Sequence, residues 1–280
     1  MSPRGADFDP ITLIARLTER DLTVIDLLAR HKIATTAILR AVVGFPSRRA
    51  ANLRLRALCD LGLLRRFRLP ATGTLRFVLD WHGQVIWAIR QGQRTPTRRD
   101  ADLAIQHIIF SAHRTHKEGV NEFFALLYEG ARAARDVRVT EWLNEADAAG
   151  TGLLGVRPDA AGTLTWDDGR ELRFWYEHDR GTETLARLVE TVDRYRTGRL
   201  ALARSRTLLI GVPGSRRLDH FLTTAPVPAD LTVAVHVTVP LPPISHEDAA
   251  PIPRIDQPRW RVLGNAELHS LRSLARRSTP

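Results

Sequence analysis

The stretch "GVRPDAAGTLTWDDGRELRFWYEHDRGTETLARLVETVDRYR", from Gly155 to Arg196, carries the pattern that decides the fold of the second half of the chain. It predicts extended runs, then a strand over "ELRFWYEHD", then a helix with apolar residues at helical spacing. A helix over residues 119–135 and a strand over "DVRVTEW" precede it, and the strand "RTLLIGV" follows. This order of α, β, β, β, α, β predicts a mixed sheet covered by helices.

Acidic residues stand at the ends of two predicted neighbouring strands. Asp159 follows Pro158 in the second strand region, and Glu177 and Asp179 end the third strand. A hard divalent cation such as Mg2+ or Mn2+ takes oxygen ligands, and it lowers the pKa of a bound water that can attack phosphate. The order and the carboxylates resemble the PD-(D/E)xK nuclease superfamily. That resemblance implies Asp159 and Glu177 as metal ligands, with Asp159, Glu177, Asp179 and Arg180 as catalytic residues if the domain is active.

A second resemblance is more specific. "RPDA", followed by "YEHDRGTETLARLVETVDRY", resembles the signature of the replication-relaxation proteins of actinobacterial plasmids and integrative elements. The matching positions in this chain are Arg157, Pro158, Asp159, Glu177, Asp179, Arg180, Gly181, Thr182, Glu183 and Tyr195. The resemblance covers most of residues 15–215. It implies a role in plasmid replication, transfer or their control.

Two positions depart from the catalytic pattern. Asp179 stands where the superfamily usually has Lys, and Thr191 stands where the family helix carries Lys. Arg180 or Arg187 would have to supply the missing charge, and arginine does not readily give up a proton. The departures favour the fold of a nuclease over its activity. An alternative for part of the motif is helix capping by Thr182 and Glu183, which leaves Asp159 and Glu177 unexplained.

The basic charge of the protein lies in its first hundred residues. Residues 1–100 hold 18 Lys and Arg against 8 Asp and Glu, whereas residues 101–280 hold 23 of each. A basic first domain beside a neutral second one favours a nucleic-acid partner for the N-terminal part. The near-exclusive use of Arg is typical of a GC-rich genome, but codon bias does not explain the asymmetry.

The first domain has the pattern of a winged helix-turn-helix. A helix begins after Thr18, a second runs from Thr35 or Thr36 to Val43, and Ser47 can cap a third. The runs "LLRRFRLP" and "TLRFVLDWHGQVIWAI" then predict a two-stranded wing. The third helix is apolar behind and Arg-rich in front, and its Cys59 is expected to be a buried thiol.

This arrangement predicts how double-stranded DNA is bound. The third helix enters the major groove, and the wing neutralises phosphates. The predicted DNA-binding residues are Arg48, Arg49, Asn52 and Arg56 on the helix and Arg65, Arg66, Arg68 and Arg76 on the wing. The alternative is a module that pairs with protein and keeps a solvated Arg face.

The predicted fold class is therefore α+β, in four parts. Residues 1–92 form the winged helix, 93–100 a linker, 101–240 the nuclease-like α/β domain, and 241–280 a Pro-rich arm with a short basic helix. A helical region over residues 101–135 carries His113 and His116, three apart, for which packing is a better explanation than metal binding. One cysteine, no signal peptide and no membrane-length apolar run indicate a cytoplasmic protein.

Three functions fit these features. The leading hypothesis is a DNA-binding accessory protein of a mobile element, with a nuclease-like domain that contacts DNA, replication or transfer proteins, or a second copy of the chain. The strongest alternative is an active Mg2+-dependent endonuclease. The third is a winged-helix transcriptional repressor whose second domain only dimerises or senses a partner.

Overall fold

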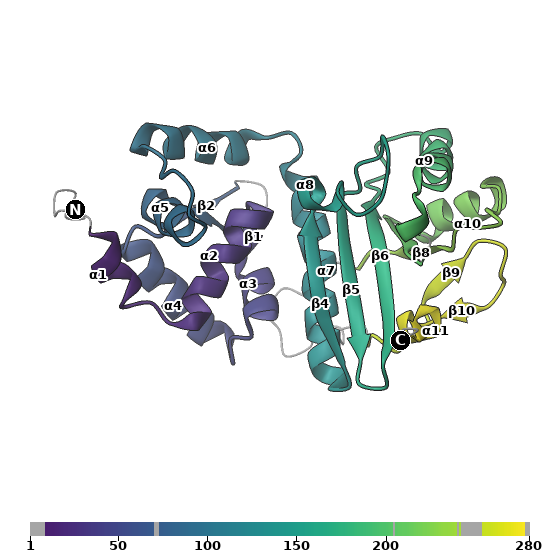
Figure 1. The fold of residues 1–280 in the computed structure, drawn as a ribbon, viewed down its shortest axis with the longest axis horizontal. Coiled ribbons are helices and arrows are strands. Elements are labelled where there is room, and N and C mark those ends of the chain that lie inside the picture. The colour runs from purple at the N-terminus through teal and green to yellow at the C-terminus, as the bar shows by residue number, and fades with distance from the viewer. Residues whose placement is uncertain (1–8, 70–72, 204, 240, 242–253, 278–280) are drawn as a thin grey trace. The chain divides into compact units, whose positions relative to one another are not determined.

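The computed structural model describes residues 9–69, 73–203, 205–239, 241 and 254–277. The chain divides into two compact units, one ending at Asn121 and the other starting at Glu122 (Figure 1). Helices and a mixed sheet build the chain, as the sequence predicts. No helix within the described ranges is long and apolar enough to cross a membrane.

The first unit consists of helices around a small antiparallel sheet of order β1-β3-β2. Its elements are α1 (Pro10–Ile14), α2 (Glu19–His31), β1 (Ala34–Thr35), α3 (Thr36–Val43), α4 (Arg48–Asp60), β2 (Leu64–Arg68), β3 (Leu75–Leu79), α5 (Trp81–Arg90), α6 (Arg98–Phe110) and the start of α7 (Arg114–Ala134). The predicted helix starts are confirmed. Thr18 and Asp21 form a capping box on α2, and Thr35 and Ser47 cap α3 and α4.

The second run of the predicted wing is shorter than the sequence suggests. β3 ends at Leu79, and Trp81–Arg90, which we expected to be extended, forms α5. Asp80 causes the switch because its side chain accepts a hydrogen bond from the Trp81 backbone N–H at 2.8 Å and caps the helix. The aromatic and β-branched residues of this run had favoured a strand.

The predicted linker is also partly helical. Thr97 and Asp100 form a capping box that starts α6 at Arg98, inside the range 93–100. Ile105 of α6 then packs with buried Ile33 and Val78, so α6 belongs to the first unit. The predicted helical region over residues 101–135 consists of two helices, since α6 ends at Phe110 and α7 begins at Arg114.

The second unit is built on an eight-stranded mixed sheet of order β10-β9-β8-β7-β6-β5-β4, with β11 paired to β6. Its elements from α7 onward are β4 (Val137–Asn144), α8 (Glu145–Ala148), β5 (Ala160–Trp166), β6 (Arg170–His178), α9 (Leu185–Gly198), the 3-10 turn η1 (Ala201–Ala203), β7 (Thr207–Val212), α10 (Ser215–Thr224), β8 (Val233–Val237), β9 (Trp260–Val262), β10 (Leu268–His269), α11 (Leu271–Leu274) and β11 (Arg276–Arg277). β4, β5 and β6 form an antiparallel meander, and β6, β7 and β8 are parallel. The predicted order of α, β, β, β, α, β is therefore present, with α9 as the crossover between β6 and β7.

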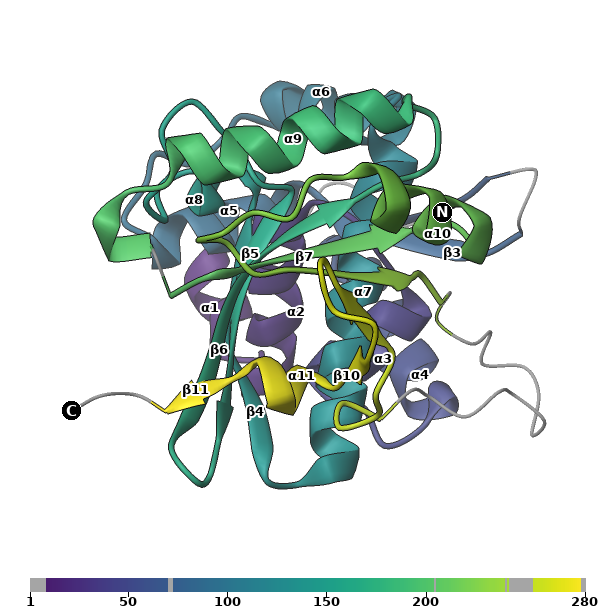
Figure 2. The same cartoon turned by 90° about the vertical axis from the view of Figure 1, so that its right-hand side faces the viewer.

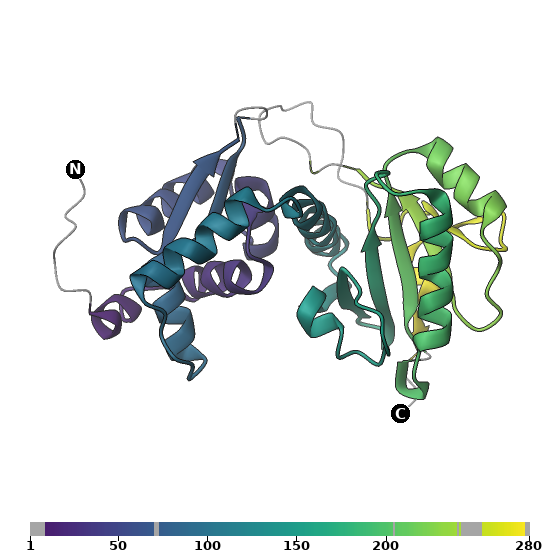
Figure 3. The ribbon, with the colours of Figure 1, turned by 90° about the horizontal axis from the view of Figure 1, so that it is seen from above.

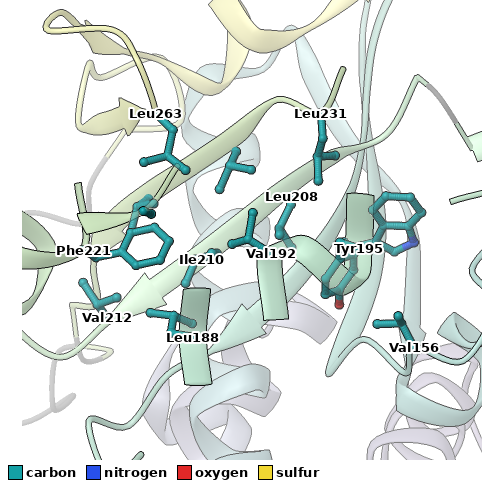
Figure 4. Close-up of a cluster of buried hydrophobic side chains, with 14 of the residues drawn as sticks. Val156, Leu188, Val192, Tyr195, Leu208, Ile210, Val212, Phe221, Leu231 and Leu263 are labelled. Atoms are coloured by element: carbon teal, nitrogen blue, oxygen red, sulfur yellow. The ribbon is translucent and has the colours of Figure 1, made fainter. Parts of the chain in front are cut away.

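The sheet of the second unit is covered on both faces. Helices α9 and α10 pack on one face, where Leu188, Val192 and Tyr195 of α9 meet Leu208 and Ile210 of β7 (Figures 2 and 4). The C-terminal part of α7 covers the other face, as Figure 3 shows. There the ring of Phe123 stacks on Tyr176 of β6 at a centroid distance of 3.8 Å, and Phe124 stacks on Trp142 of β4 at 4.7 Å.

The C-terminal segment differs from its prediction. We expected residues from Trp260 to Arg277 to end in a basic amphipathic helix. Instead β9, β10 and β11 extend the sheet, and only the single turn α11 is helical. Trp260 is buried on β9, where the strand pairs with β8. Most of the predicted Pro-rich arm lies outside the described residues.

Candidate functional site

Helix α4 separates an apolar face from a basic one. Ala51, Leu55 and Leu58 are buried at helical spacing. On the opposite side four polar residues are exposed, namely Arg48, Arg49, Asn52 and Arg56. The Ser47 hydroxyl caps the helix by accepting a hydrogen bond from the Ala50 N–H at 3.1 Å, so the two arginines that follow lie in the first turn.

The hairpin β2–β3 divides its arginines between two faces. Because successive strand residues point to opposite sides, Arg66 and Arg68 share one face and Arg65 lies on the other. Arg66 pairs across the ladder with Phe77, and Arg68 pairs with Leu75. Arg66 and Arg68 are both exposed.

The basic faces of α4 and the hairpin border one groove of about 640 Å³. The groove is lined by Arg48, Arg49, Asn52, Leu53, Arg56, Arg66, Leu75 and Phe77. None of these side chains is a carboxylate, so nothing in the lining neutralises the four guanidinium groups. Leu53, which is 70% exposed, adds apolar surface to the lining. The groove thus combines positive charge with apolar side chains.

Two predicted DNA-binding arginines are used inside the fold instead. Arg76 is buried, and its Nε and Nη2 donate to the two carboxylate oxygens of Glu118 at 2.6 and 2.9 Å. Arg65 bonds to Asp80 at 2.8 Å and to Asp102 at 2.7 Å. Both lie on the hairpin face opposite to that of Arg66 and Arg68, because side chains alternate between the two faces of a strand. Neither Arg65 nor Arg76 lines the groove.

A buried ion pair fixes the orientation of α4. Asp21 of α2 is fully buried and accepts from Arg54 of α4, whose Nε lies 2.7 Å from the carboxylate. Although burial opposes ionisation, the Arg54 guanidinium and the Thr18 cap hydrogen bonds hold the pKa of Asp21 below its usual value. Asp21 therefore caps α2 and anchors α4 with the same carboxylate.

In the second unit, the structure brings Asp159 and Glu177 together. Ala160 pairs with Tyr176 at the start of β5, so the antiparallel register places Asp159 beside Glu177. One Asp159 oxygen accepts the backbone N–H of His178 at 2.8 Å. Glu177 accepts a hydrogen bond from the hydroxyl of Tyr195, on α9, at 2.5 Å. Two strands and one helix thus hold the pair.

The surroundings of Glu177 disfavour its ionised form. Burial raises the pKa of Glu177 well above its usual value, and the charge of Asp159 and a hydrogen bond to its carboxyl raise it further. The Tyr195 hydrogen bond and the positive charge of Arg194 oppose that rise. Burial and the neighbouring carboxylate therefore favour the protonated form of Glu177.

The other predicted catalytic residues do not complete this pair. Asp179 binds Arg217 of α10 through both carboxylate oxygens, and its own N–H donates to Gly211 O at 2.9 Å. Arg180 is exposed. Thr191 donates its hydroxyl to the Arg187 carbonyl at 3.0 Å, as helical threonines often do.

Arg194 is the residue that sequence reasoning missed. It lies one helical turn after Thr191, and its Nη2 donates to the Thr191 hydroxyl at 3.0 Å. Its charge acts on both Glu177 and Tyr195. The three-residue spacing on α9 was the available signal, because residues three apart share a helix face. Arg194 therefore supplies a cation beside the position where the family pattern has Lys.

The donor set suits only a hydrated hard cation. In the ranges that the structure describes, no three His, Cys, Asp or Glu side chains gather as metal ligands. Asp159 and Glu177 offer two neighbouring carboxylates, and Mg2+ commonly binds through one or two carboxylates and keeps several waters. His113 precedes α7 and His116 lies within it, and neither joins such a group.

Comparison with known proteins agrees with the motif resemblance. The family model for replication-relaxation proteins matches residues 25–212, which include α4, the hairpin, Asp159 and Glu177. No similar protein was found among curated proteins, and no solved structure matched. The match spans more than half of the chain and reaches from the first unit into the second. The chain therefore belongs to the replication-relaxation family.

Proposed function

We propose that the protein binds double-stranded DNA through its first unit, as a winged helix-turn-helix, and serves the replication, transfer or relaxation of a plasmid or other mobile element. The basic groove between α4 and the β2–β3 hairpin carries this proposal. Its arginines can neutralise phosphates, and Asn52 can read a base edge in the major groove. Family membership supports the mobile-element role.

An arginine pair at the start of α4 provides the test. Arg48→Ala with Arg49→Ala should weaken binding to a fluorescein-labelled duplex by at least tenfold at low salt, because two phosphate or base contacts are lost. Helix α6 offers a matched control. Arg98 and Arg99 also follow a capping residue and are exposed, but they do not line the groove. Arg98→Ala with Arg99→Ala should leave affinity close to wild type. Equal losses in the two double variants would refute docking through α4.

A second activity is favoured by the carboxylate pair. We propose that the second unit is a PD-(D/E)xK nuclease-like domain in which Asp159 and Glu177 hold Mg2+ or Mn2+. The order of α7, β4, β5, β6, α9 and β7 and the placement of Asp159 beside Glu177 support it. The cation would supply Lewis-acid stabilisation of phosphate charge. Arg194 would then contribute the positive charge that Thr191 lacks.

Nicking of supercoiled plasmid separates an active nuclease from an inactive fold. If the domain is active, the wild type nicks plasmid with Mg2+ or Mn2+, and Asp159→Asn and Glu177→Gln each abolish nicking. Asp193→Asn is a matched control, because Asp193 is an exposed carboxylate on α9 that binds Arg196 of the same helix. If the protein binds DNA in a salt-sensitive way but does not nick it, the DNA-binding proposal stands and the nuclease activity is refuted.

A further inference from the structure

A cavity of about 720 Å³ opens in the first unit, away from the DNA groove. Its walls come from α2, the end of β3, α5, α6 and the start of α7. No residue lines both the cavity and the groove. Small-molecule sites in proteins commonly enclose about 300 to 1,000 Å³, so the cavity has the size of a ligand pocket.

The cavity has an apolar wall and a positive rim. The wall is formed by Leu28, Ile33, Leu79, Trp87, Leu103 and Ile108. The cations at the cavity are Lys32, Arg94, Arg114 and Lys117, and none of the lining residues is acidic. An apolar body would displace water from the wall, and a negative head group would meet the rim.

Two hydrogen-bond donors at the cavity are enclosed without an acceptor. Within the part of the chain that the structure describes, the indole Nε1–H of Trp87 and the Nε–H of Arg114 are buried and make no hydrogen bond. The Glu118 carboxylate lies 4.0 Å from Arg114 Nε, beyond hydrogen-bond range. Buried donors are normally satisfied, so these two point to an acceptor that the chain itself does not provide.

We infer that this cavity binds a small amphipathic organic anion, with an aromatic or alkyl body and a carboxylate, sulfonate or phosphate head. The body lies against Trp87 and Leu103, and the head is held by Arg94 and Arg114. Arg94 is exposed at the rim, so its charge can be removed without disturbing the core. This site is independent of the DNA groove.

Binding of 1-anilinonaphthalene-8-sulfonate to the full chain tests the inference. We expect a 1:1 complex by calorimetry and a rise in thermal midpoint on binding, since a ligand of the native state stabilises it. The neutral analogue N-phenyl-1-naphthylamine should bind at least tenfold more weakly, because it lacks the charged head. A fall in thermal midpoint would mean that the probe binds unfolded chains and would overturn the inference.

Matched variants locate the site. Arg94→Gln should weaken sulfonate binding by about tenfold, as expected for one lost charge-assisted hydrogen bond. The control Arg99→Gln removes an exposed arginine outside the cavity and should leave the affinity for the sulfonate unchanged. Ala104→Phe fills the cavity from an exposed helix position, so the fold is kept and both probes should lose affinity. Wild-type affinity in both Arg94→Gln and Ala104→Phe would overturn the inference. The double Arg48, Arg49 variant should still bind the probe.

Discussion

Replacing Arg66 and Arg68, the two arginines on one face of the hairpin, should change the salt dependence of DNA binding by a calculable amount. Five arginines present guanidinium groups on this surface, namely Arg48, Arg49, Arg56, Arg66 and Arg68. If each contacts one phosphate, log K against log salt has a slope of about −4.5, at about −0.9 per contact. Arg66→Ala with Arg68→Ala leaves three contacts and a slope of about −2.7.

These slopes give a clear difference in one experiment. Raising salt from about 50 to about 200 mM should weaken wild-type binding about 500-fold and the double variant about 40-fold. Fluorescence anisotropy on one duplex over four salt concentrations measures both slopes. The two residues are exposed strand positions, so the variant should unfold close to the wild-type temperature.

Arg65→Ala is the matched control on the same strand. Arg65 neighbours Arg66, but it faces the other side of the hairpin and binds Asp80 and Asp102. Its loss should lower stability by about 1 kcal/mol or less, because the pair is partly exposed, and should leave the slope unchanged. If Arg65→Ala flattens the slope as much as the loss of Arg66 and Arg68 does, the hairpin does not contact DNA through the face that carries Arg66 and Arg68.

Three further predictions concern stability and can be measured by urea unfolding. Burial, followed by the charges of Arg30 and Lys32, lowers the pKa of His31 to about 3. Between about pH 6.5 and 3 the unfolded chain therefore binds a proton that the native chain does not, and the free energy of unfolding should fall with falling pH by up to about 1.4 kcal/mol per pH unit. His31→Leu should remove this contribution. Arg76→Met should cost about 3 to 5 kcal/mol, because the buried Glu118 carboxylate loses both of its hydrogen bonds to Arg76 and keeps Arg114 at 4.0 Å; Arg76→Met with Glu118→Leu should cost less, and the reverse order would contradict a buried pair. Gly162→Ala should cost about 1 to 3 kcal/mol, because its new Cβ would lie 2.5 Å from the Phe174 ring, and an unchanged midpoint would mean that the sheet can relax around it.

Local signals in the sequence predicted much of the fold. Thr18, Thr35 and Ser47 begin helices where their side chains can cap them, and Gly44 ends α3 with a φ of 76° that other residues rarely adopt. The helix at Trp81 was missed because its composition favours a strand. The Asp80 cap and the burial of Val85, Ile86 and Ala88 on one side of α5 accompany the helix that this composition did not suggest.

The parts of the site that depend on distant partners could not be predicted in the same way. Nothing local to Arg76 on β3 shows that Glu118 on α7 will bind it. The meeting of Asp159 with Glu177 follows from the strand order, because Asp159 directly precedes β5 and Glu177 lies near the end of the antiparallel neighbour β6. The role of Arg194 needed the helix register relative to the sheet, which only packing fixes.

The charge asymmetry that suggested DNA binding has a physical explanation in the first unit. Its basic surplus is not spread evenly, since buried and half-buried carboxylates bind the arginines that build the scaffold. These pairs are Asp21 with Arg54, Asp26 with Arg90, Asp80 with Arg65, and Glu118 with Arg76. These four carboxylates are thereby engaged with scaffold arginines, and no carboxylate stands among the residues that line the α4 groove. Because the carboxylates that balance part of the positive charge lie away from the groove, the local positive potential at the groove attracts phosphate more strongly than the net charge of the unit indicates.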